Sequence, residues 1–421
     1  MPESALNADR MMERLRELSQ ITSTPGRGVT RLAYSPEDIL GRRLVAQWMD
    51  EAGLAVREDA ATNVIGVRPG RTDRILMIGS HLDTVKQAGH LDGTYGAVAA
   101  IEVADMLYRN QTTLEHTLVV VGFSNEEGAY GTPGMTGSHA LAGVFKPEWL
   151  EAEDHEGVTL AERIRSTGGQ PSDLTQPDID GSLLDGFIEL HIEQGPVLES
   201  AGVPIGIVQA ITGRDGFVLE LHGMANHAGT TPMADRHDAL VAAAHVVLAV
   251  EGLADEGWVR VATVGVMEVG PGSSNVIPDR VSMSIEVRDA DDARVEAALA
   301  ELLGRIEAIV DLTSTTYTYQ RVPHVLAVAI NSLLADCVAS AADSLELESV
   351  PIESGAGHDA QVIANVAPIA MIFVPSSEGV SHSSLEHTSA LHLRGGAEVL
   401  AAAVIEADAR ISPPPTMAAH G

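Results

Sequence analysis

The 421-residue sequence predicts an α/β protein with a mostly parallel sheet and a second, smaller domain inserted into the first. Two observations lead to this prediction. In the first half, short apolar runs typical of strands alternate with amphipathic stretches typical of helices, which is the pattern of a parallel sheet. From Gly216 the order becomes strand, helix, strand, strand, helix, strand, which is the ferredoxin-like βαββαβ unit.

The first half supplies the sheet elements in chain order. A helix is expected from Met11 to Leu18, where apolar residues recur every three or four positions. A second helix should begin after Ser35, an N-cap residue followed by Pro36, and should stop at Gly53. Apolar runs predict strands at residues 64–67, 75–79, 117–123 and 187–192. A helix is expected between the second and third of these strands, at residues 95–108.

The inserted domain is predicted to span residues 212–323, between two segments of the first domain at 1–211 and 324–421. Its strands are expected at 216–222, 259–267, 280–288 and 314–320, and its helices at 235–250 and 292–309. The first domain then resumes with strands at 347–352 and 370–375 and a final helix. The tail 411–421, with three consecutive prolines, is expected to fray.

Composition excludes several classes of function. The chain has 26 Lys+Arg against 59 Asp+Glu, a formal charge of −33, so nucleic acid and anionic membranes are unsuitable partners. The single cysteine, Cys337, is expected to be buried and excludes a thiolate zinc cluster, so a metal ion must use histidines and carboxylates. We see neither a signal sequence at the N-terminus nor an apolar run of about 18 residues, which predicts a soluble, cytoplasmic protein.

Polar residues follow the predicted strands. His81 and Asp83 come after the strand at 75–79, and residues two apart face the same side, so His81 can bind a metal ion while Asp83 accepts its ring N–H. A solvated turn is the alternative for this pair. Glu126 and Glu127 follow the strand at 117–123, where one carboxylate can bind metal while the other acts as a base on water. Two surface glutamates are the alternative.

Two metal ions explain the candidates better than one. One ion would be held by His81 and His191, and the other by Glu127 and His382. Asp92 would be shared between them, as in hydrolases whose two ions lie about 3.5–4 Å apart. Such ligands suit zinc, manganese, cobalt or nickel, among which the sequence does not choose. A single-metal site with spare histidines is the alternative.

Seven motifs follow one another along nearly the whole chain. They are Gly79-Ser80-His81-Leu82-Asp83-Thr84-Val85, Leu91-Asp92-Gly93, Ser124-Asn125-Glu126-Glu127-Gly128, His191-Ile192-Glu193-Gln194-Gly195-Pro196, His227-Ala228-Gly229-Thr230-Thr231-Pro232-Met233, Gly355-Ala356-Gly357-His358-Asp359-Ala360 and Ser381-His382. Together they closely resemble the amidase, hydantoinase and carbamoylase branch of the M20 metallopeptidase family, which includes N-carbamoyl-L-amino-acid hydrolases and allantoate amidohydrolases.

The resemblance implies a zinc-peptidase-like catalytic domain that binds two metal ions, and an inserted domain that serves as a lid and dimerisation domain in a homodimer. It implies Glu126 as the general base. His191, where peptidase relatives usually carry a carboxylate, favours the carbamoylase side of the family. The implied metal ligands are His81, Asp92, Glu127, His191 and His382.

Two residues of the inserted domain are candidates to anchor a substrate carboxylate. Arg288 can hold a carboxylate with a two-pronged fork; an arginine paired with Asp289 or Asp291 is the alternative. Asn275 lies in a tight loop and could be only a turn former. The resemblance favours carboxylate binding for both.

The resemblance implies further residues that contact the substrate. His227 resembles an oxyanion-stabilising histidine, which relatives can supply across a dimer, and Gln194 resembles an amide contact beside the metals. The loop of Gly355, Ala356 and Gly357 lets the backbone approach a ligand closely.

Four functions are compatible with these features. The leading one is an N-carbamoyl-L-amino-acid hydrolase, which converts a small ureido acid to amino acid, carbon dioxide and ammonia. An allantoate amidohydrolase would use the same residues on a diureido acid. A dipeptidase or aminoacylase is disfavoured by His191 and Gln194, and a non-catalytic binding module by the complete ligand set and Glu126.

Overall fold

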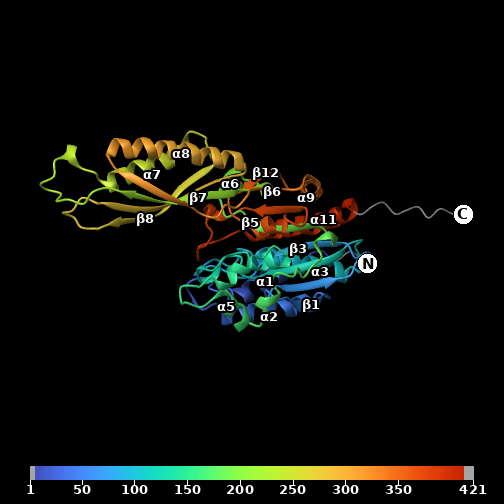
Figure 1. Cartoon of the computed structure of the whole chain (residues 1–421). Helices are drawn as coiled ribbons and strands as arrows, with labels where there is room; N and C mark the ends of the chain where they lie inside the picture. The colour runs from blue at the N-terminus through green and yellow to red at the C-terminus, as the bar shows by residue number, and fades with distance from the viewer. Residues whose placement is uncertain (1–4, 412–421) are drawn as a thin grey trace. The chain divides into compact units, whose positions relative to one another are not determined.

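The computed structural model describes residues 5–411, which divide into two compact units. Unit 1 contains the chain up to Gln209, Ile330–Ile352 and the chain from His358 onwards, and unit 2 contains Ala210–Ala329 and Glu353–Gly357. The elements of both are labelled in Figure 1. Residues 412–421 of the tail that was expected to fray lie outside the described range.

Unit 1 holds the larger sheet and the helices packed on it. Its helices are α1 (Ala8–Ser19), α2 (Pro36–Glu51), α3 (Thr94–Arg109), α4 (Thr136–Leu141), α5 (Leu160–Ser166), α6 (Val197–Ala201), α9 (Ser332–Ser344), α10 (Asp359–Ile363) and α11 (Ala390–Ile411). Its strands are β1 (Ala55–Glu58), β2 (Val64–Arg68), β3 (Ile75–His81), β4 (Thr117–Phe123), β5 (Leu184–Ile192), β13 (Ile369–Val374), and β6 (Ile205–Ile211) and β12 (Ser349–Ser354), which each end in unit 2 residues.

The strands run in the order β1-β2-β4-β3-β5-β13-β6, and β12 also pairs with β6. The central four strands, β4, β3, β5 and β13, are parallel to one another. The outer pairs are antiparallel: β1 with β2, β2 with β4, and β6 with β13. The structure is therefore a mixed α/β fold whose sheet is parallel at its centre.

The register of the parallel strands decides where the polar residues meet. His81 at the end of β3 pairs with Phe123 at the end of β4, and His191 near the end of β5 pairs with Phe373 of β13. The carboxyl ends of all four central strands therefore lie at one edge of the sheet, where α/β proteins form their sites.

Local sequence explains the helices next to this edge. The Ser35 side chain accepts a hydrogen bond from the Asp38 N–H, and Pro36 opens α2, as predicted. Helix α3 begins after Gly93, whose φ of +62° is left-handed. A Cβ on Gly93 would lie 2.4 Å from the His81 ring, so only glycine allows α3 to start this close to β3.

Alternating residues of the central strands divide between two faces. Leu76 and Ile78 of β3 join a core cluster that includes Leu190 of β5 and residues of α1, α2, α3, α9 and α11. Cys337 of α9 is buried in the same cluster, as predicted. This core fixes the strands whose ends carry the polar residues.

Unit 2 contains a four-stranded antiparallel sheet in the order β10-β7-β9-β8. Helices α7 and α8 contact each other and this sheet, and Figure 1 shows both on one face of it. The elements follow one another as strand, helix, strand, strand, helix, strand. They are β7 (Gly213–His222), α7 (Ala239–Asp255), β8 (Val261–Gly270), β9 (Arg280–Asp289), α8 (Asp292–Thr313) and β10 (Thr316–Arg321), followed by the short β11 (Val328–Ala329), which pairs with Ala210 and Ile211.

The segment Glu353–Gly357 groups with unit 2, although the sequence analysis assigned it to the first domain with the rest of 324–421. Hydrogen bonds account for the difference. The Thr212 N–H donates to the Ser354 carbonyl oxygen, and Arg288 Nη1 donates to the Gly355 oxygen at 3.0 Å. These contacts join residues too far apart in sequence to be read from a local pattern.

In the part of the chain that the structure describes, no helix combines the length and apolar character that a membrane crossing requires.

Candidate metal centre

Five segments of unit 1 bring the predicted ligands and base to the carboxyl edge of the sheet. They are the end of β3, the loop before α3, the loop after β4, the end of β5 and the loop after β13. These carry, in that order, His81, Asp92, Glu126 with Glu127, His191, and His382.

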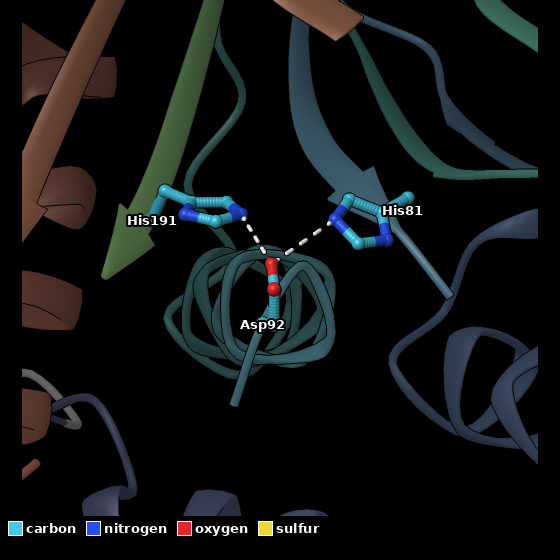
Figure 2. A group of neighbouring side chains, drawn as sticks. All are labelled: His81, Asp92 and His191. Atoms are coloured by element: carbon cyan, nitrogen blue, oxygen red, sulfur yellow. Dashed lines mark ion pairs between the residues drawn. The ribbon is translucent and has the colours of Figure 1, made fainter. Parts of the chain in front are cut away.

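The first group joins His81, Asp92 and His191, all buried. One oxygen of Asp92, Oδ1, lies 3.4 Å from His81 Nε2 and 3.2 Å from His191 Nε2. Figure 2 shows the two rings approaching this oxygen from neighbouring strands. The ligand atoms lie within 4.8 Å of one another, so this group could hold one metal ion.

The second group uses the other oxygen of the same carboxylate. His382 Nε2 lies 3.0 Å from Asp92 Oδ2 and 3.2 Å from Glu127 Oε1. A third combination, His81 with Glu126 and Glu127, also has its ligand atoms within 4.8 Å. Asp92 thus presents one oxygen to each of two groups.

Main-chain carbonyls orient both buried rings. His81 Nδ1 lies 3.0 Å from the Asp83 carbonyl oxygen, and His191 Nδ1 lies 2.8 Å from that of Ile192. When Nδ1 carries the proton and donates it to these oxygens, the Nε2 lone pair is left for a metal ion. Gly93 N–H, 3.1 Å from His191 Nε2, approaches that lone pair as a donor.

The role predicted for the Asp83 side chain needs correction. Its carboxylate lies 3.9 Å from His81 Nδ1, so the ring N–H is accepted by the Asp83 main chain instead. The carboxylate accepts the backbone N–H groups of Glu126 and Glu127 at 3.1 and 3.2 Å. The chain turns after β3, which aims the Asp83 side chain at the neighbouring loop. Asp83 therefore holds the main chain of the glutamate pair.

Burial and neighbouring charges separate the acids of the cluster. Burial would raise the pKa of Asp92, but hydrogen bonds from His191, His382 and His81 hold it well below the usual value. Hydrogen bonds to Asp92 and Glu127 raise the pKa of His382 to about 10. Burial, with the charge of Glu127 added, raises the pKa of Glu126 well above its usual range. Asp92 therefore stays ionised beside a far more basic Glu126.

Three non-glycine residues beside the site have left-handed backbone: Asn125 with φ +54°, Gln194 with φ +59° and His382 with φ +52°. Such conformations cost about 1 kcal/mol or more each, so the surrounding contacts must enforce them. Asn125 shows how: its side-chain amide donates to Pro133 O and Thr136 Oγ1, which fixes the chain just before Glu126.

Gln194 lies where it was predicted, beside the cluster. Its Nε2 donates to Asp92 Oδ2 at 3.0 Å. Two further contacts of Asp92 were missed by the sequence analysis. Ser381 Oγ lies 3.3 Å from Asp92 Oδ2, and Glu386 accepts the Asp92 N–H at 3.3 Å. The one available signal was that Ser381 adjoins His382 within a recognised motif.

The remaining six predicted residues belong to unit 2, where they form two groups: His227 with Asn275, and Arg288 with the loop of Gly355, Ala356 and Gly357. His227 and Asn275 lie on adjoining loops, because the Ala228 N–H donates to the Asn275 carbonyl at 2.9 Å. Arg288 pairs with Glu286, with both Nε and Nη2 at 2.7 Å from Oε1, and its Nη1 donates to Gly355.

The alternative partners predicted for Arg288 are engaged elsewhere. Asp289 forms an ion pair with Arg294 at 3.2 Å, and Asp291 caps α8 by accepting the Ala293 N–H. Ala356 and Gly357 continue the Gly355 loop, in which the Ala356 N–H donates to Ser354 Oγ at 3.2 Å.

Residues 77–406 match the model of peptidase family M20/M25/M40. The chain belongs to this family. Two relatives and one solved structure illustrate the branch. The chain is 38% identical to the N-carbamoyl-L-amino acid amidohydrolase of Geobacillus stearothermophilus, over 94% of this chain and 97% of the relative. It is 34% identical to the allantoate deiminase of Arabidopsis thaliana, over 91% of this chain and 79% of the relative.

Among solved structures, the crystal structure of an amidase of the hydantoinase/carbamoylase family from Burkholderia multivorans has a TM-score of 0.88 and 34% identity, over 98% of this chain and 100% of that one. These likenesses confirm the resemblance to the amidase, hydantoinase and carbamoylase branch of the M20 family.

The donor set of this M20 protein fits divalent metal ions. Imidazole nitrogens and carboxylate oxygens converge, and Asp92 is held ionised by neighbouring histidines. Ligands of these two kinds suit zinc and its first-row neighbours. Family and donor set together indicate that the protein uses divalent metal.

Proposed function

We propose that this M20 protein is an N-carbamoyl-L-amino-acid hydrolase that works with two divalent metal ions. One observation carries the proposal: Asp92 offers Oδ1 to His81 and His191, and Oδ2 to His382. A carboxylate shared in this way is what a two-metal hydrolase needs. The amidohydrolase of Geobacillus stearothermophilus, 38% identical over nearly the whole chain, supports the choice of substrate class.

In this proposal His81 and His191 hold one ion, and Glu127 and His382 hold the other, with Asp92 between them. The candidate metals are zinc, manganese, cobalt and nickel. When bound, the ions supply Lewis acidity, which lowers the pKa of water and polarises the ureido carbonyl.

Glu126 is proposed as the general base. It lies next to the ligand Glu127, and Asp83 fixes the main chain of both residues. Its raised pKa suits a group that takes a proton from water and passes it to a leaving amine. Water adds to the ureido carbon and one C–N bond breaks, which releases one amine and leaves a carbamate. The carbamate then loses carbon dioxide as its remaining C–N bond breaks, so that the products are amino acid, carbon dioxide and ammonia.

Unit 2 is proposed to be a ferredoxin-like lid and dimerisation domain, corresponding to the insertion predicted at residues 212–323 between the catalytic segments 1–211 and 324–421. The order β10-β7-β9-β8 with two helices on one face supports the name. We assign Arg288 and Asn275 to the substrate carboxylate and His227 to the developing oxyanion.

Three adjoining residues, Gly355, Ala356 and Gly357, are proposed to contact the substrate through their main chain. Their loop is hydrogen-bonded to Arg288, which supports a shared role. Gln194, which donates to Asp92, is proposed to contact substrate or metal-bound ligands as an amide.

A homodimer is supported by apolar surface on unit 2. Val266 and Met267 on β8, an edge strand, are exposed, as are Leu240 and Leu248 on the adjoining α7. An unpaired strand edge beside exposed apolar side chains suits a symmetric interface. A cytoplasmic location stays a prediction of the sequence.

The second candidate function is allantoate amidohydrolase, favoured by the 34% identity to the allantoate deiminase of Arabidopsis thaliana. The same cluster would act on a diureido acid. A dipeptidase or aminoacylase is the weaker alternative.

The test is a parallel assay of the metal-loaded protein on N-carbamoyl-L-methionine, allantoate and a dipeptide. We expect turnover to be fastest on the first. Glu126→Gln should lower kcat about 10²- to 10⁴-fold, because it removes the base. Metal analysis should find two ions per chain in both wild type and variant.

Glu148→Gln provides the control, since Glu148 is exposed in a short 3-10 helix, Pro147–Glu151, that holds none of the proposed ligands, and the variant should keep wild-type activity. Faster hydrolysis of allantoate would favour the second candidate. A Glu126→Gln variant with wild-type turnover would contradict the assigned base, and cleavage of the dipeptide alone would contradict both ureido-acid proposals.

A further inference from the structure

Glu386 is a buried carboxylate that lies behind the cluster and has no role in the function proposed above. The residue is 5% exposed, and its carboxylate accepts from three donors. Oε1 lies 2.9 Å from the Leu91 N–H nitrogen and 3.3 Å from that of Asp92, and Oε2 lies 3.0 Å from Ser381 Oγ. Glu386 therefore joins the loop before α3 to the loop after β13, nearly 300 residues later in the chain.

The contacts of Ser381 close a ring around Asp92. Ser381 Oγ lies 3.0 Å from Glu386 Oε2 and 3.3 Å from Asp92 Oδ2. Gln194 Nε2 also reaches both Asp92 Oδ2 and Ser381 Oγ, at 3.0 and 3.4 Å. Glu386 thus accepts the main-chain N–H of Asp92 directly and fixes Ser381 beside the Asp92 carboxylate. The single hydroxyl proton of Ser381 can be donated to either carboxylate, but to only one of them at a time.

Packing around Glu386 shows that its place is tightly defined. A Cβ added to Gly89 would lie 2.1 Å from Glu386 Oε1 and 2.4 Å from Glu386 Cβ. Only glycine at position 89 lets the chain that leads to Asp92 lie against this side chain. His382, which follows Ser381, has a left-handed backbone with φ +52° and so needs contacts that hold it there.

We propose that Glu386 is a positioning residue that locks Asp92 against the Ser381–His382 loop, so that each Asp92 oxygen faces its own group of histidines. The inference rests on the proposed function only in taking Asp92 and His382 as metal ligands. Three hydrogen bonds accepted by one buried carboxylate set the distance between the two loops. Without them, Asp92 and His382 would lose their fixed separation.

Three substitutions of Glu386 distinguish the role of its hydrogen bonds from that of its charge. Glutamine at position 386 keeps the length of the side chain: its oxygen can accept from Leu91 and Asp92, and its amide can donate to Ser381 Oγ. Ser381 can then donate to Asp92. Aspartate keeps the charge but is one methylene shorter. Alanine removes both acceptor oxygens and with them all three hydrogen bonds, which leaves the buried N–H groups of Leu91 and Asp92 without this acceptor.

The experiment measures metal binding directly. Zn²⁺ and Co²⁺ are titrated into metal-free full-length protein in competition with a chromophoric chelator, which gives a dissociation constant for each of the two ions. We expect Glu386→Ala and Glu386→Asp to weaken binding of the ion held by His382 about 10- to 100-fold. Loss of the contacts that support a ligand has an effect of this size in other metal sites. Glu386→Gln should stay within about threefold of wild type.

Asp154→Ala is the matched control. Asp154 is also buried and accepts two backbone N–H groups, from Glu156 at 2.8 Å and Val158 at 3.0 Å, in a loop of unit 1 that holds none of the proposed ligands. It should lose stability and keep both metal affinities. Absorption spectra of the Co²⁺ protein add a second readout, since altered coordination changes the visible bands of Glu386→Asp and leaves those of Asp154→Ala as in wild type.

The proposal is overturned if Glu386→Ala and Glu386→Asp bind both ions as tightly as wild type. It is equally overturned if Glu386→Gln weakens binding as far as alanine does, since charge would then be the cause. Should Glu386→Ala fail to fold, the Asp and Gln variants decide between the same outcomes. Failure of the proposed function would appear separately, as wild-type protein that binds metal normally and hydrolyses no ureido acid.

Discussion

His116 uses both ring nitrogens to bond carboxylates at the end of unit 1 where β4 and β5 begin. Nδ1 lies 2.8 Å from Asp408 Oδ1 and Nε2 lies 3.1 Å from Asp185 Oδ2. Because both nitrogens face acceptors, the arrangement favours the doubly protonated ring. The hydrogen bond to Asp408 is the main cause that raises the pKa of His116, and burial opposes it.

We expect this network to make stability depend on pH. A histidine whose pKa is raised by folding stabilises the protein fully below its unfolded value of about 6.5 and loses that contribution as pH rises through the folded value. The pKa values of Asp408 and Asp185 are lowered by folding, so their contribution is lost in acid. His116→Gln should destabilise the protein by about 2–3 kcal/mol near pH 6.

The measurement is the difference in unfolding free energy between wild type and His116→Gln at each pH from 5 to 10, which cancels the titration of groups common to both. The difference should shrink as pH rises. His155→Gln, at an exposed histidine, should show no such trend. A difference that stays constant across this range would mean that the ring is not charged in the folded protein.

Single residues also show what the sequence could predict about the site. His81, His191 and the Glu126–Glu127 pair could be expected to lie together, because each follows a strand of a parallel sheet and such ends meet at one edge. Whether Asp83 would use its main chain or its carboxylate depended on the turn after β3, which no pattern specifies. Glu386 leaves no signal, because two of its three donors are main-chain N–H groups of a segment nearly 300 residues away in the chain, which no residue type marks.

At the scale of elements, glycines control how closely helices approach the sheet. Gly96 of α3 faces β5, where an added Cβ would lie 2.0 Å from the Leu190 carbonyl oxygen and 2.9 Å from Ser80 Cβ. The main-chain oxygen cannot move aside without disturbing the sheet. Gly304 of α8 has no atom within 4 Å of its added Cβ.

The two glycines therefore predict opposite effects of the same substitution. Gly96→Ala should destabilise unit 1 by about 1–3 kcal/mol through overpacking. Gly304→Ala should stabilise unit 2 by about 0.5–1 kcal/mol, since alanine is the better helix former. Calorimetry that resolves the transitions of the two units would check both signs. A Gly96→Ala variant with the stability of wild type would show that α3 can shift away from β5.

Elements were predictable where side chains alternate or caps are clear. In β9 every second residue is buried, so period-two patterning located this strand to within a residue. Ser35 and Pro36 located the start of α2. Strand β1 was missed, because its four residues Ala55–Glu58 are mostly exposed and carry no apolar alternation. It exists through pairing with β2, which a local pattern does not contain.

For the whole molecule, the proposed homodimer can be tested on the apolar surface of unit 2. Leu248 on α7 and Val266 on β8 are 63% and 57% exposed. Leu248→Glu and Val266→Glu should each shift sedimentation from dimer to monomer, because burying a charge without a partner opposes association. Leu391→Glu, at a 75% exposed leucine of α11 in unit 1, should leave the dimer intact.

A wild-type protein that sediments as a monomer at micromolar concentration would contradict the dimer. Dimers that persist in both unit 2 variants would place the interface elsewhere.

The change in the order of strands and helices at Gly216 predicts an inserted domain at 212–323, and unit 2 of the structure spans Ala210–Ala329 and Glu353–Gly357. The grouping of Glu353–Gly357 with unit 2 was not visible in the sequence. That grouping depends on Arg288 reaching Gly355, 67 residues away in the chain.

The position of β13 between β5 and β6 has a consequence for synthesis. β5 and β6 leave the ribosome together, but the strand that separates them begins only at Ile369, after the whole of unit 2 has been made. At about 5–20 residues per second, the wait is roughly 8–30 seconds. Through that interval unit 2 can complete its own sheet, while β5 and β6 present open edges to other chains.

The proposed metal centre is completed late, because His382 follows β13 and of the described elements only α11 comes after it. A nascent chain would therefore hold an incomplete set of the proposed ligands, and we expect tight metal binding only in chains that are nearly complete.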